Sequence, residues 1–253
     1  MGGWQFWIDR GGTFTDVVAR RPDGSTVTHK LLSENPRIYD DAAIQGIRQL
    51  LDLSDDDPLP FDEISAVKMG TTVATNALLE REGEPTAFIT TAGFADALRI
   101  GYQARPELFA LDIVLPEMLY TKVVEIDERI SADGSVILPL DVPSAKTLLA
   151  QVRGEGFDAI AIALLHGYRY TEHEKILHQI ASEIGFQQIS VSHEVSPLMK
   201  LVSRGDTTVV DAYLSPILRR YVNSVDEKLR PDGTGPNLMF MQSNGGLTDA
   251  NHF

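Results

Sequence analysis

Short segments with apolar residues and few helix signals mark the first part of the chain. Residues 4–9, 14–20 and 25–32 are rich in aromatic and β-branched residues, which are typical of β-strands. Pro22-Asp23-Gly24, between the second and third segments, favours a tight turn. The pattern therefore predicts an antiparallel three-stranded meander at the start of the fold.

Helical periodicity then alternates with short apolar runs. A helix with one apolar face is predicted after Asn35-Pro36, followed by a buried strand at 64–69. A second helix opens at Gly70-Thr71-Thr72, and residues 86–91 form the next strand. A meander extended by parallel strands through helical crossovers is typical of the ribonuclease-H-like α/β architecture with a mixed sheet.

The remainder of the chain carries a second α/β pattern. A long helix is predicted over 206–229, interrupted or kinked at Pro216, before a final strand over 237–242. The chain stops soon after this strand and a glycine turn, so the sequence favours a truncated domain at the front of a larger protein. The other predicted segments are strands at 120–126, 136–138, 159–165 and 188–192 and helices at 142–153 and 171–184.

Composition and charge narrow the class of protein. The 253 residues include 22 Lys and Arg against 36 Asp and Glu, a formal net charge of −14, and no basic run of the kind that binds nucleic acid. With no cysteine in the chain, disulfides, thiolate metal sites and cysteine nucleophiles are excluded. The longest apolar run, 159–165, is too short to cross a membrane, and we expect a cytoplasmic protein.

The most informative motif runs from Asp9 to Asp16. An apolar strand leads into an acid, two glycines, hydroxyl residues and a second acid. Glycine can adopt positive φ and lets backbone amides approach a ligand, and successive amides can bind phosphate oxygens. Flanking carboxylates can hold a hard cation such as Mg²⁺. The motif therefore predicts a nucleotide phosphate site, with a hairpin whose glycines serve only the turn as the alternative.

Two further polar motifs follow predicted strands. Gly70, Thr71 and Thr72 stand where a strand passes into a helix whose free amides favour anions, and Asn76 lies one turn further on. Simple capping of the helix by a threonine is the alternative. Asn244, Gly245 and Gly246 follow the last strand. That motif gains weight because ligand sites of α/β proteins gather at strand ends.

Several histidines could be interpreted as metal ligands or site residues, but the sequence around them does not favour this. His173-Glu174 followed by His178 lacks the spacing of a zinc-binding helix, and we expect these residues on an exposed helix surface. His166 and His193 follow strands, and we interpret them as structural. A phosphate-binding loop of the G-x-x-x-x-G-K-[ST] kind is absent from the sequence.

These motifs resemble the signatures of the hydantoinase/oxoprolinase family. The resemblance rests on residues 8–16, 70–81 and 241–247, which occur in the family's order. Within the family, the ATP-dependent 5-oxoprolinase branch is most similar, on the residues at 101–109, 119–129 and 204–216. Tyr102 departs from the asparagine expected in that branch, and Asn244 is equally similar to the hydantoinase branch.

The resemblance implies an ATPase lobe of the actin/Hsp70/sugar-kinase type that uses ATP, Mg²⁺ and K⁺ to hydrolyse a small cyclic amide. Asp9 and Asp16 would be the catalytic and metal-binding residues, and Arg105 a weaker candidate for contacting substrate. The residues implied to line the nucleotide site are Gly11, Gly12, Thr13, Thr15, Gly70, Thr71, Thr72, Asn76, Asn244, Gly245 and Gly246.

The resemblance also implies domains and partners. Residues 1–200 would form the N-terminal domain, and residues 201–253 the incomplete start of a hydantoinase A-type second domain. A second ATPase lobe and a hydantoinase B-like region would complete the enzyme, and we expect a homo-oligomer and little turnover from this chain alone. An ATP-dependent N-methylhydantoinase, an acetone carboxylase-like subunit and a non-catalytic interaction module stay open as alternatives.

Overall fold

The computed structural model describes residues 2–54, 56–103, 109, 111–115, 117–250 and 252–253. The chain forms two compact units. Unit 1 comprises Met1–Glu80 and Ile217–Phe253, and unit 2 comprises Arg81–Pro216. Helix α7 (Leu201–Leu229) contributes residues to both units and runs without a break through Pro216, so the predicted interruption is wrong.

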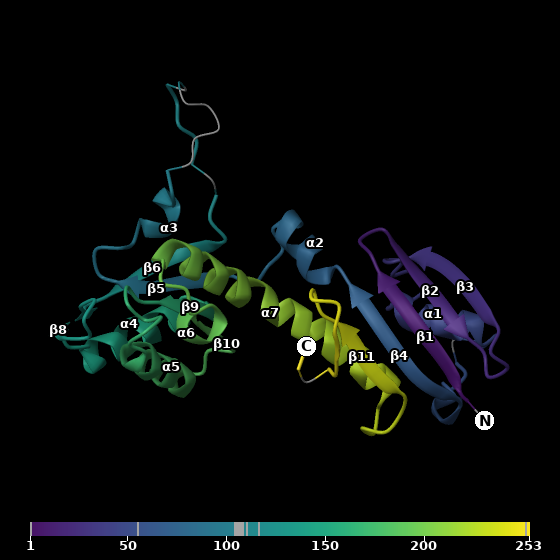
Figure 1. Ribbon diagram of the computed structural model, residues 1–253. Coiled ribbons are helices and arrows are strands. Elements are labelled where there is room, and N and C mark those ends of the chain that lie inside the picture. The colour runs from purple at the N-terminus through teal and green to yellow at the C-terminus, as the bar shows by residue number, and fades with distance from the viewer. Residues whose placement is uncertain (1, 55, 104–108, 110, 116, 251) are drawn as a thin grey trace. The chain divides into compact units, whose positions relative to one another are not determined.

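Unit 1 is built on a six-stranded mixed sheet in the order β12-β11-β4-β1-β2-β3 (Figure 1). Neighbours β1, β2 and β3 are antiparallel, whereas β4 runs parallel to both β1 and β11. The strands are β1 (Trp4–Arg10), β2 (Phe14–Arg20), β3 (Thr26–Leu32), β4 (Ile64–Thr71), β11 (Asn237–Met241) and β12 (Leu247–Thr248).

One face of this sheet carries the core of unit 1. Alternate strand residues such as Phe6, Val17 and Phe240 are completely buried there, as strand periodicity dictates. Helix α1 (Ala42–Leu50) and the second part of α7 supply the opposing apolar side chains, among them Ile47 and Val225. Asp41 caps α1 by accepting from the amides of residues 43 and 44.

Unit 2 contains a parallel four-stranded sheet in the order β10-β9-β5-β6. Every residue of β5 and β9 is buried, because layers pack on both faces. Helices α4 and α5 supply one layer, and α7 supplies Val209 and Ala212 to the other. The strands are β5 (Thr86–Thr91), β6 (Tyr120–Ile126), β9 (Ala159–Ala163) and β10 (Gln188–Val191).

The remaining elements of the chain are short helices, two helices of 13 residues and one hairpin. Strands β7 and β8 pair antiparallel in a separate two-stranded sheet. The described residues include no helix that is both long and apolar enough to cross a bilayer. These remaining elements are η1 (Phe61–Glu63), α2 (Val73–Glu80), α3 (Ala97–Ile100), β7 (Arg129–Ile130), β8 (Val136–Leu138), α4 (Val142–Gly154), α5 (Glu172–Ile184) and α6 (Ser192–Val195).

The predicted fold class is confirmed, but one predicted connection is wrong. The sequence pattern adds the strand at 86–91 to the first sheet, whereas β5 lies in the sheet of unit 2. The strand beside β4 is instead β11, which lies more than 160 residues later in the chain. An apolar run fits any buried parallel strand, so the pattern could not say which sheet it joins.

Candidate functional site

The three motifs come together at one edge of the unit 1 sheet. Strands β1, β4 and β11 are parallel neighbours, so their carboxyl ends share that edge (Figure 1). Residues 11–13 follow β1, Thr72 follows β4, and residues 242–246 follow β11. Loops that meet in this way at strand ends are the usual place for a ligand in α/β proteins.

The loop between β1 and β2 is a tight hairpin held by its own backbone. The Gly11 amide donates to the Phe14 carbonyl at 3.1 Å, and no hydrogen bond within the described residues uses the amides of Gly12 or Thr13. Neither glycine adopts positive φ, so that part of the prediction is wrong. Their small size matters instead, because a Cβ on Gly11 would lie 2.9 Å from the Phe14 oxygen.

The hairpin is braced by the start of α2. Thr72 donates its amide and its hydroxyl to the Arg10 carbonyl at 3.1 and 3.3 Å, and Asn76 Nδ2 lies 3.3 Å from Thr72 Oγ1. A Cβ on Gly12 would lie 2.9 Å from that Asn76 nitrogen. The first two motifs are thus in direct contact, while Thr71 Oγ1 accepts from the Val73 amide as a helix cap would.

The two candidate acids face each other across the hairpin but differ in their partners. Asp9 and Asp16 are directly paired in the β1–β2 ladder, and Gly70 is the neighbour of Asp9 on β4. Lys30 contacts both carboxylate oxygens of Asp16 at 2.8 Å. Asp9 is exposed, and its carboxylate has neither a hydrogen-bond donor nor a cation among the described residues. Asp9 is therefore the acid with free coordinating capacity.

Thr15 is placed where it cannot contact a phosphate through its side chain. It is completely buried, and its hydroxyl lies 2.9 Å from Ser33 Oγ. Ser33 also donates from Oγ to the Gly11 carbonyl at 2.7 Å and from its amide to the Thr13 carbonyl at 2.9 Å. The sequence analysis missed Ser33, although a serine directly after a predicted strand beside the glycine turn was the available signal.

The third motif forms the turn between β11 and β12. Gly245 adopts φ of +82°, a conformation that favours glycine, and its amide donates to the Gln242 carbonyl. Asn244 Oδ1 accepts from the Gly246 amide at 2.7 Å, so the asparagine oxygen stabilises its own loop. Arg105, the weaker candidate for substrate, lies outside the described residues.

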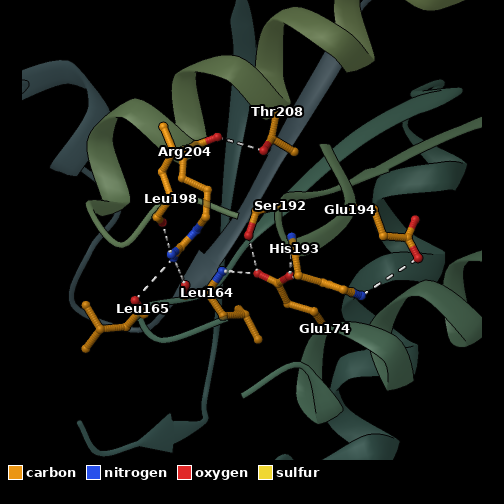
Figure 2. A network of polar contacts seen from close by, with 9 residues as sticks. All are labelled: Leu164, Leu165, Glu174, Ser192, His193, Glu194, Leu198, Arg204 and Thr208. Carbon is orange, nitrogen blue, oxygen red and sulfur yellow. Dashed lines mark hydrogen bonds and ion pairs between the residues drawn. The ribbon is translucent and has the colours of Figure 1, made fainter. Parts of the chain in front are cut away.

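Strand ends in unit 2 also carry polar residues, and these are buried. Figure 2 shows Glu174 accepting from the Leu164 amide at 2.9 Å and from the Ser192 hydroxyl at 2.6 Å. Its second oxygen lies 2.7 Å from His193 Nδ1. His173 is likewise buried and lies 2.7 Å from Glu128 Oε2. The prediction that His173 and Glu174 lie on an exposed helix surface is therefore wrong.

The residues at the unit 1 edge fit a nucleotide with Mg²⁺ better than a metal held by protein alone. No group of three or more His, Cys, Asp or Glu able to hold a metal occurs among the described residues. Mg²⁺ in nucleotide sites is bound by one or two carboxylates, with phosphates and waters completing its shell. The free carboxylate of Asp9 beside the unpaired hairpin amides matches that donor set.

Comparisons with known proteins identify the family. Residues 5–185 match the model of the hydantoinase/oxoprolinase N-terminal region, and residues 204–253 match that of hydantoinase/oxoprolinase. The chain belongs to the hydantoinase/oxoprolinase family. The resemblance drawn from the three motifs is thereby confirmed.

Relatives within the family are much longer than this chain. The protein 5-oxoprolinase 1 of Arabidopsis thaliana is 41% identical over 98% of the chain, and 5-oxoprolinase of Saccharomyces cerevisiae is 40% identical over 97%. The chain spans 22% of the length of each. The crystal structure of the ATP-dependent caprolactamase from Pseudomonas jessenii aligns with 97% of this chain and 36% of its own, with a TM-score of 0.81 and 29% identity.

Proposed function

We propose that this chain is the phosphate-binding part of a longer ATP-dependent 5-oxoprolinase. Such an enzyme hydrolyses 5-oxo-L-proline to L-glutamate and couples this to hydrolysis of ATP. The observation that carries the proposal is the meeting of three motif loops at one sheet edge, with Asp9 and two hairpin amides that have no partner among the described residues. Relatives about 40% identical bear the name 5-oxoprolinase, which supports the choice of substrate.

The residues at this edge take distinct parts in the proposed site. The amides of Gly12 and Thr13 donate to phosphate oxygens. Gly70 is the neighbour of Asp9 on β4, and a Cβ at Gly70 would make only an ordinary contact, 3.6 Å from Asp9 Oδ1. Asp9 holds Mg²⁺, which when bound neutralises phosphate charge. Asp16 with Lys30, and Thr72 with Asn76, keep the loops in position. Gly245 and Gly246, in the turn between β11 and β12, form the third loop of the proposed site.

The reaction explains why a phosphate site serves a cyclic amide hydrolase. A lactam carbonyl is a poor electrophile, and its nitrogen is a poor leaving group. Transfer of the γ-phosphoryl group of ATP to the carbonyl oxygen releases ADP and activates the carbon. Water then attacks that carbon and the ring C–N bond breaks, which leaves the opened chain as an acyl phosphate. A second water hydrolyses this acyl phosphate to phosphate and glutamate. Positioning and charge neutralisation provide most of the catalysis in phosphoryl transfer, and these are what the hairpin residues offer.

The proposal extends to the parts of the enzyme beyond this chain. A second ATPase lobe and a hydantoinase B-like region would complete the site, with residues 1–200 and 201–253 belonging to successive family domains. The use of K⁺ and a homo-oligomeric state stay predictions from the resemblance, and a cytoplasmic location stays a prediction from the composition. Arg105 keeps its predicted contact with substrate.

Release of ADP and glutamate by the full-length protein tests the proposal. With 5-oxo-L-proline and Mg-ATP, we expect glutamate and ADP in equal amounts. Reactions without a lactam, and with N-methylhydantoin or caprolactam instead, are the controls. An ADP release that occurs only with hydantoin or caprolactam would reject 5-oxoproline as the substrate and keep the phosphate site. Failure to bind Mg-ATP at all would reject the phosphate site as well.

Hydrolysis of a neutral lactam is the second candidate function. It is favoured by the structural similarity to an enzyme described as an ATP-dependent caprolactamase, at a TM-score of 0.81. The two candidates share the chemistry at the carbonyl and differ in one group, because 5-oxoproline carries a carboxylate that caprolactam lacks. A residue that binds this carboxylate would separate them.

A further inference from the structure

Arg10 occupies a particular place at the proposed site. It is the last residue of β1, between Asp9 and the hairpin glycines, and its backbone is fixed by the two hydrogen bonds from Thr72. Consecutive strand residues point to opposite faces, so the Arg10 side chain lies on the helix-covered face. There its guanidinium carbon is 4.8 Å from the ring centroid of Tyr221 on α7.

Both members of this pair have a buried donor that is not used. Arg10 Nε and the Tyr221 hydroxyl are buried and have no hydrogen-bond partner within the described residues. Arg10 also has no carboxylate within ion-pair distance in that part of the chain. Native structures satisfy nearly all their buried polar groups, so two unsatisfied donors on one stacked pair of side chains require an explanation.

Neighbouring groups do not supply the acceptor. The negative charge of Asp41 affects the pKa of Tyr221, but Asp41 does not accept a hydrogen bond from the Tyr221 hydroxyl. Asp41 Oδ1 instead accepts from the amides of Ala43 and Ile44 at the start of α1. Burial raises the pKa of the Tyr221 hydroxyl well above its ordinary value, and the Asp41 charge adds to this. Tyr221 is thus a proton donor over the whole physiological pH range.

Stacking of the Arg10 guanidinium on the Tyr221 ring explains the position of the two side chains, but it does not explain why their donors have no acceptor. A cation–π contact uses the face of the guanidinium and leaves its N–H groups free to donate in its plane. Arginine next to a second donor is an arrangement that binds carboxylate or phosphate oxygens, since charge-assisted hydrogen bonds are the strong ones. Arg10 directly precedes the hairpin to which the proposed function assigns phosphate.

We propose that Arg10 and Tyr221 form an oxyanion subsite that binds a carboxylate or phosphate oxygen of a ligand at the hairpin edge. The inference rests on the proposed function and deepens it, because it names the chemical class of the group that is recognised. Two groups of the proposed reactants could supply such an oxygen, namely a phosphate of the nucleotide and the carboxylate of 5-oxoproline. In the second case the subsite selects an anionic lactam over a neutral one.

Substitutions in the full-length enzyme test the subsite. Tyr221→Phe removes one hydroxyl and keeps the stacked ring, and Arg10→Gln removes the charge. Tyr213→Phe on the same helix and Arg20→Gln at the far end of β2 are the matched controls. We would measure the dissociation constants of Mg-ATP and Mg-ADP, kcat and KM for 5-oxoproline, KM for caprolactam, and the thermal unfolding midpoint.

We expect Arg10→Gln to weaken binding of one anionic ligand by about tenfold or more, and Tyr221→Phe by a smaller factor, as loss of charge-assisted hydrogen bonds requires. A raised dissociation constant for Mg-ATP assigns the subsite to a phosphate. A raised KM for 5-oxoproline, with Mg-ATP binding and the KM for caprolactam unchanged, assigns it to the lactam carboxylate.

Other outcomes would overturn the subsite. If both variants bind Mg-ATP and 5-oxoproline as the wild type does, the pair has no part in ligand recognition. A lower unfolding midpoint with unchanged binding would make the pair purely structural. A wild-type enzyme that binds Mg-ATP but never turns over 5-oxoproline would reject the substrate of the proposed function. In that case, the dissociation constants of Mg-ATP for the two variants would still show whether the subsite binds a phosphate.

Discussion

Strand ends in the two units carry similar residue types but use them differently. In unit 2, Glu174 contacts His193 and the buried Arg204 donates to backbone carbonyls (Figure 2), although Arg204 Nε has no partner among the described residues. Glu128 and His173 form a second bonded pair there. In unit 1, Asp9 is exposed and has no partner among the described residues, and Arg10 Nε and the Tyr221 hydroxyl are buried without one. Polar groups bonded to one another maintain a fold, whereas an exposed acid without a partner beside free loop amides indicates a ligand site.

The buried charged groups of unit 2 are held by several hydrogen bonds each, although Arg204 Nε itself has no partner among the described residues. Glu174 makes contacts through both oxygens, and Gly167 beside it could not carry a Cβ, which would lie 2.1 Å from Glu174 Oε1. Arg204 donates to the carbonyls of residues 164, 165 and 198. Its pKa is lowered by burial, an effect that the charge of Glu174 opposes. This network acts as structure, so its loss should appear in stability.

Arg204→Leu should have the largest effect on stability. The substitution removes a buried guanidinium that donates to three backbone carbonyls, one of them in a buried and two in a part-buried hydrogen bond. We expect a loss of about 3–5 kcal/mol in unfolding free energy. Urea unfolding of the protein measures it. Arg169→Leu on the exposed surface is the control. An Arg204 variant as stable as the control would contradict the claim that the polar network of unit 2 stabilises the fold.

Glu174→Gln should cost less, because the side chain keeps its shape and one of its two acceptor oxygens. We expect a loss of about 1–3 kcal/mol, since an amide nitrogen cannot accept the hydrogen bonds that the lost oxygen accepted. Chemical denaturation reports the change. Glu194→Gln is the matched control, as Glu194 is exposed and lies 3.7 Å from the same histidine. Equal stability of the two variants would contradict the prediction.

Ser33→Ala should combine a modest loss of stability with weaker nucleotide binding. It deprives the Gly11 carbonyl and the Thr15 hydroxyl of their partner, at about 1–2 kcal/mol. Because the hairpin is then less well held, the dissociation constant of Mg-ATP should rise. Ser65→Ala, which removes an exposed hydroxyl at the other end of the sheet, should leave binding unchanged. Unchanged binding in both variants would show that Ser33 does not position the hairpin.

The smallest effect is expected at Asp133, an exposed turn acid in unit 2. Hydrogen bonds from Ser131 and Ser135 lower its pKa to about 2. A pKa lowered on folding stabilises the fold above the ordinary value of about 4 and loses this contribution as the pH falls toward 2. The stability difference between wild type and Asp133→Asn should therefore shrink over that range. A difference that does not depend on pH would contradict this assignment.

Much of the fold and part of the site could be predicted from the sequence. Aromatic and β-branched residues bounded by turn residues place β1, β2 and β3 within one residue of their observed bounds. The motifs at Asp9, Gly70 and Asn244 do lie at strand ends of one sheet, because they follow parallel strands. Local patterns carry this information, since each depends on residues close together in the chain.

Other features could not be predicted because they depend on distant residues. The pairing of β4 with β11 is decided by packing across an insertion of more than 130 residues, which no local period reveals. The burial of His173 and Glu174 depends on partners from other elements, namely Glu128 and Ser192. Ser33 and Tyr221 are ordinary residues in sequence and gain significance only from what they contact.

The most direct test of the central claim is ADP release from Mg-ATP by the full-length protein carrying Asp9→Asn. Asp23→Asn, an exposed acid at the opposite end of the same sheet, is the control. The account predicts that Asp9→Asn lowers the rate by about 100-fold or more while leaving the unfolding midpoint unchanged, because the Asp9 carboxylate has no partner within the part of the chain that the structure describes. Wild-type ADP release by this variant would contradict the assignment of the unit 1 edge as the nucleotide phosphate site.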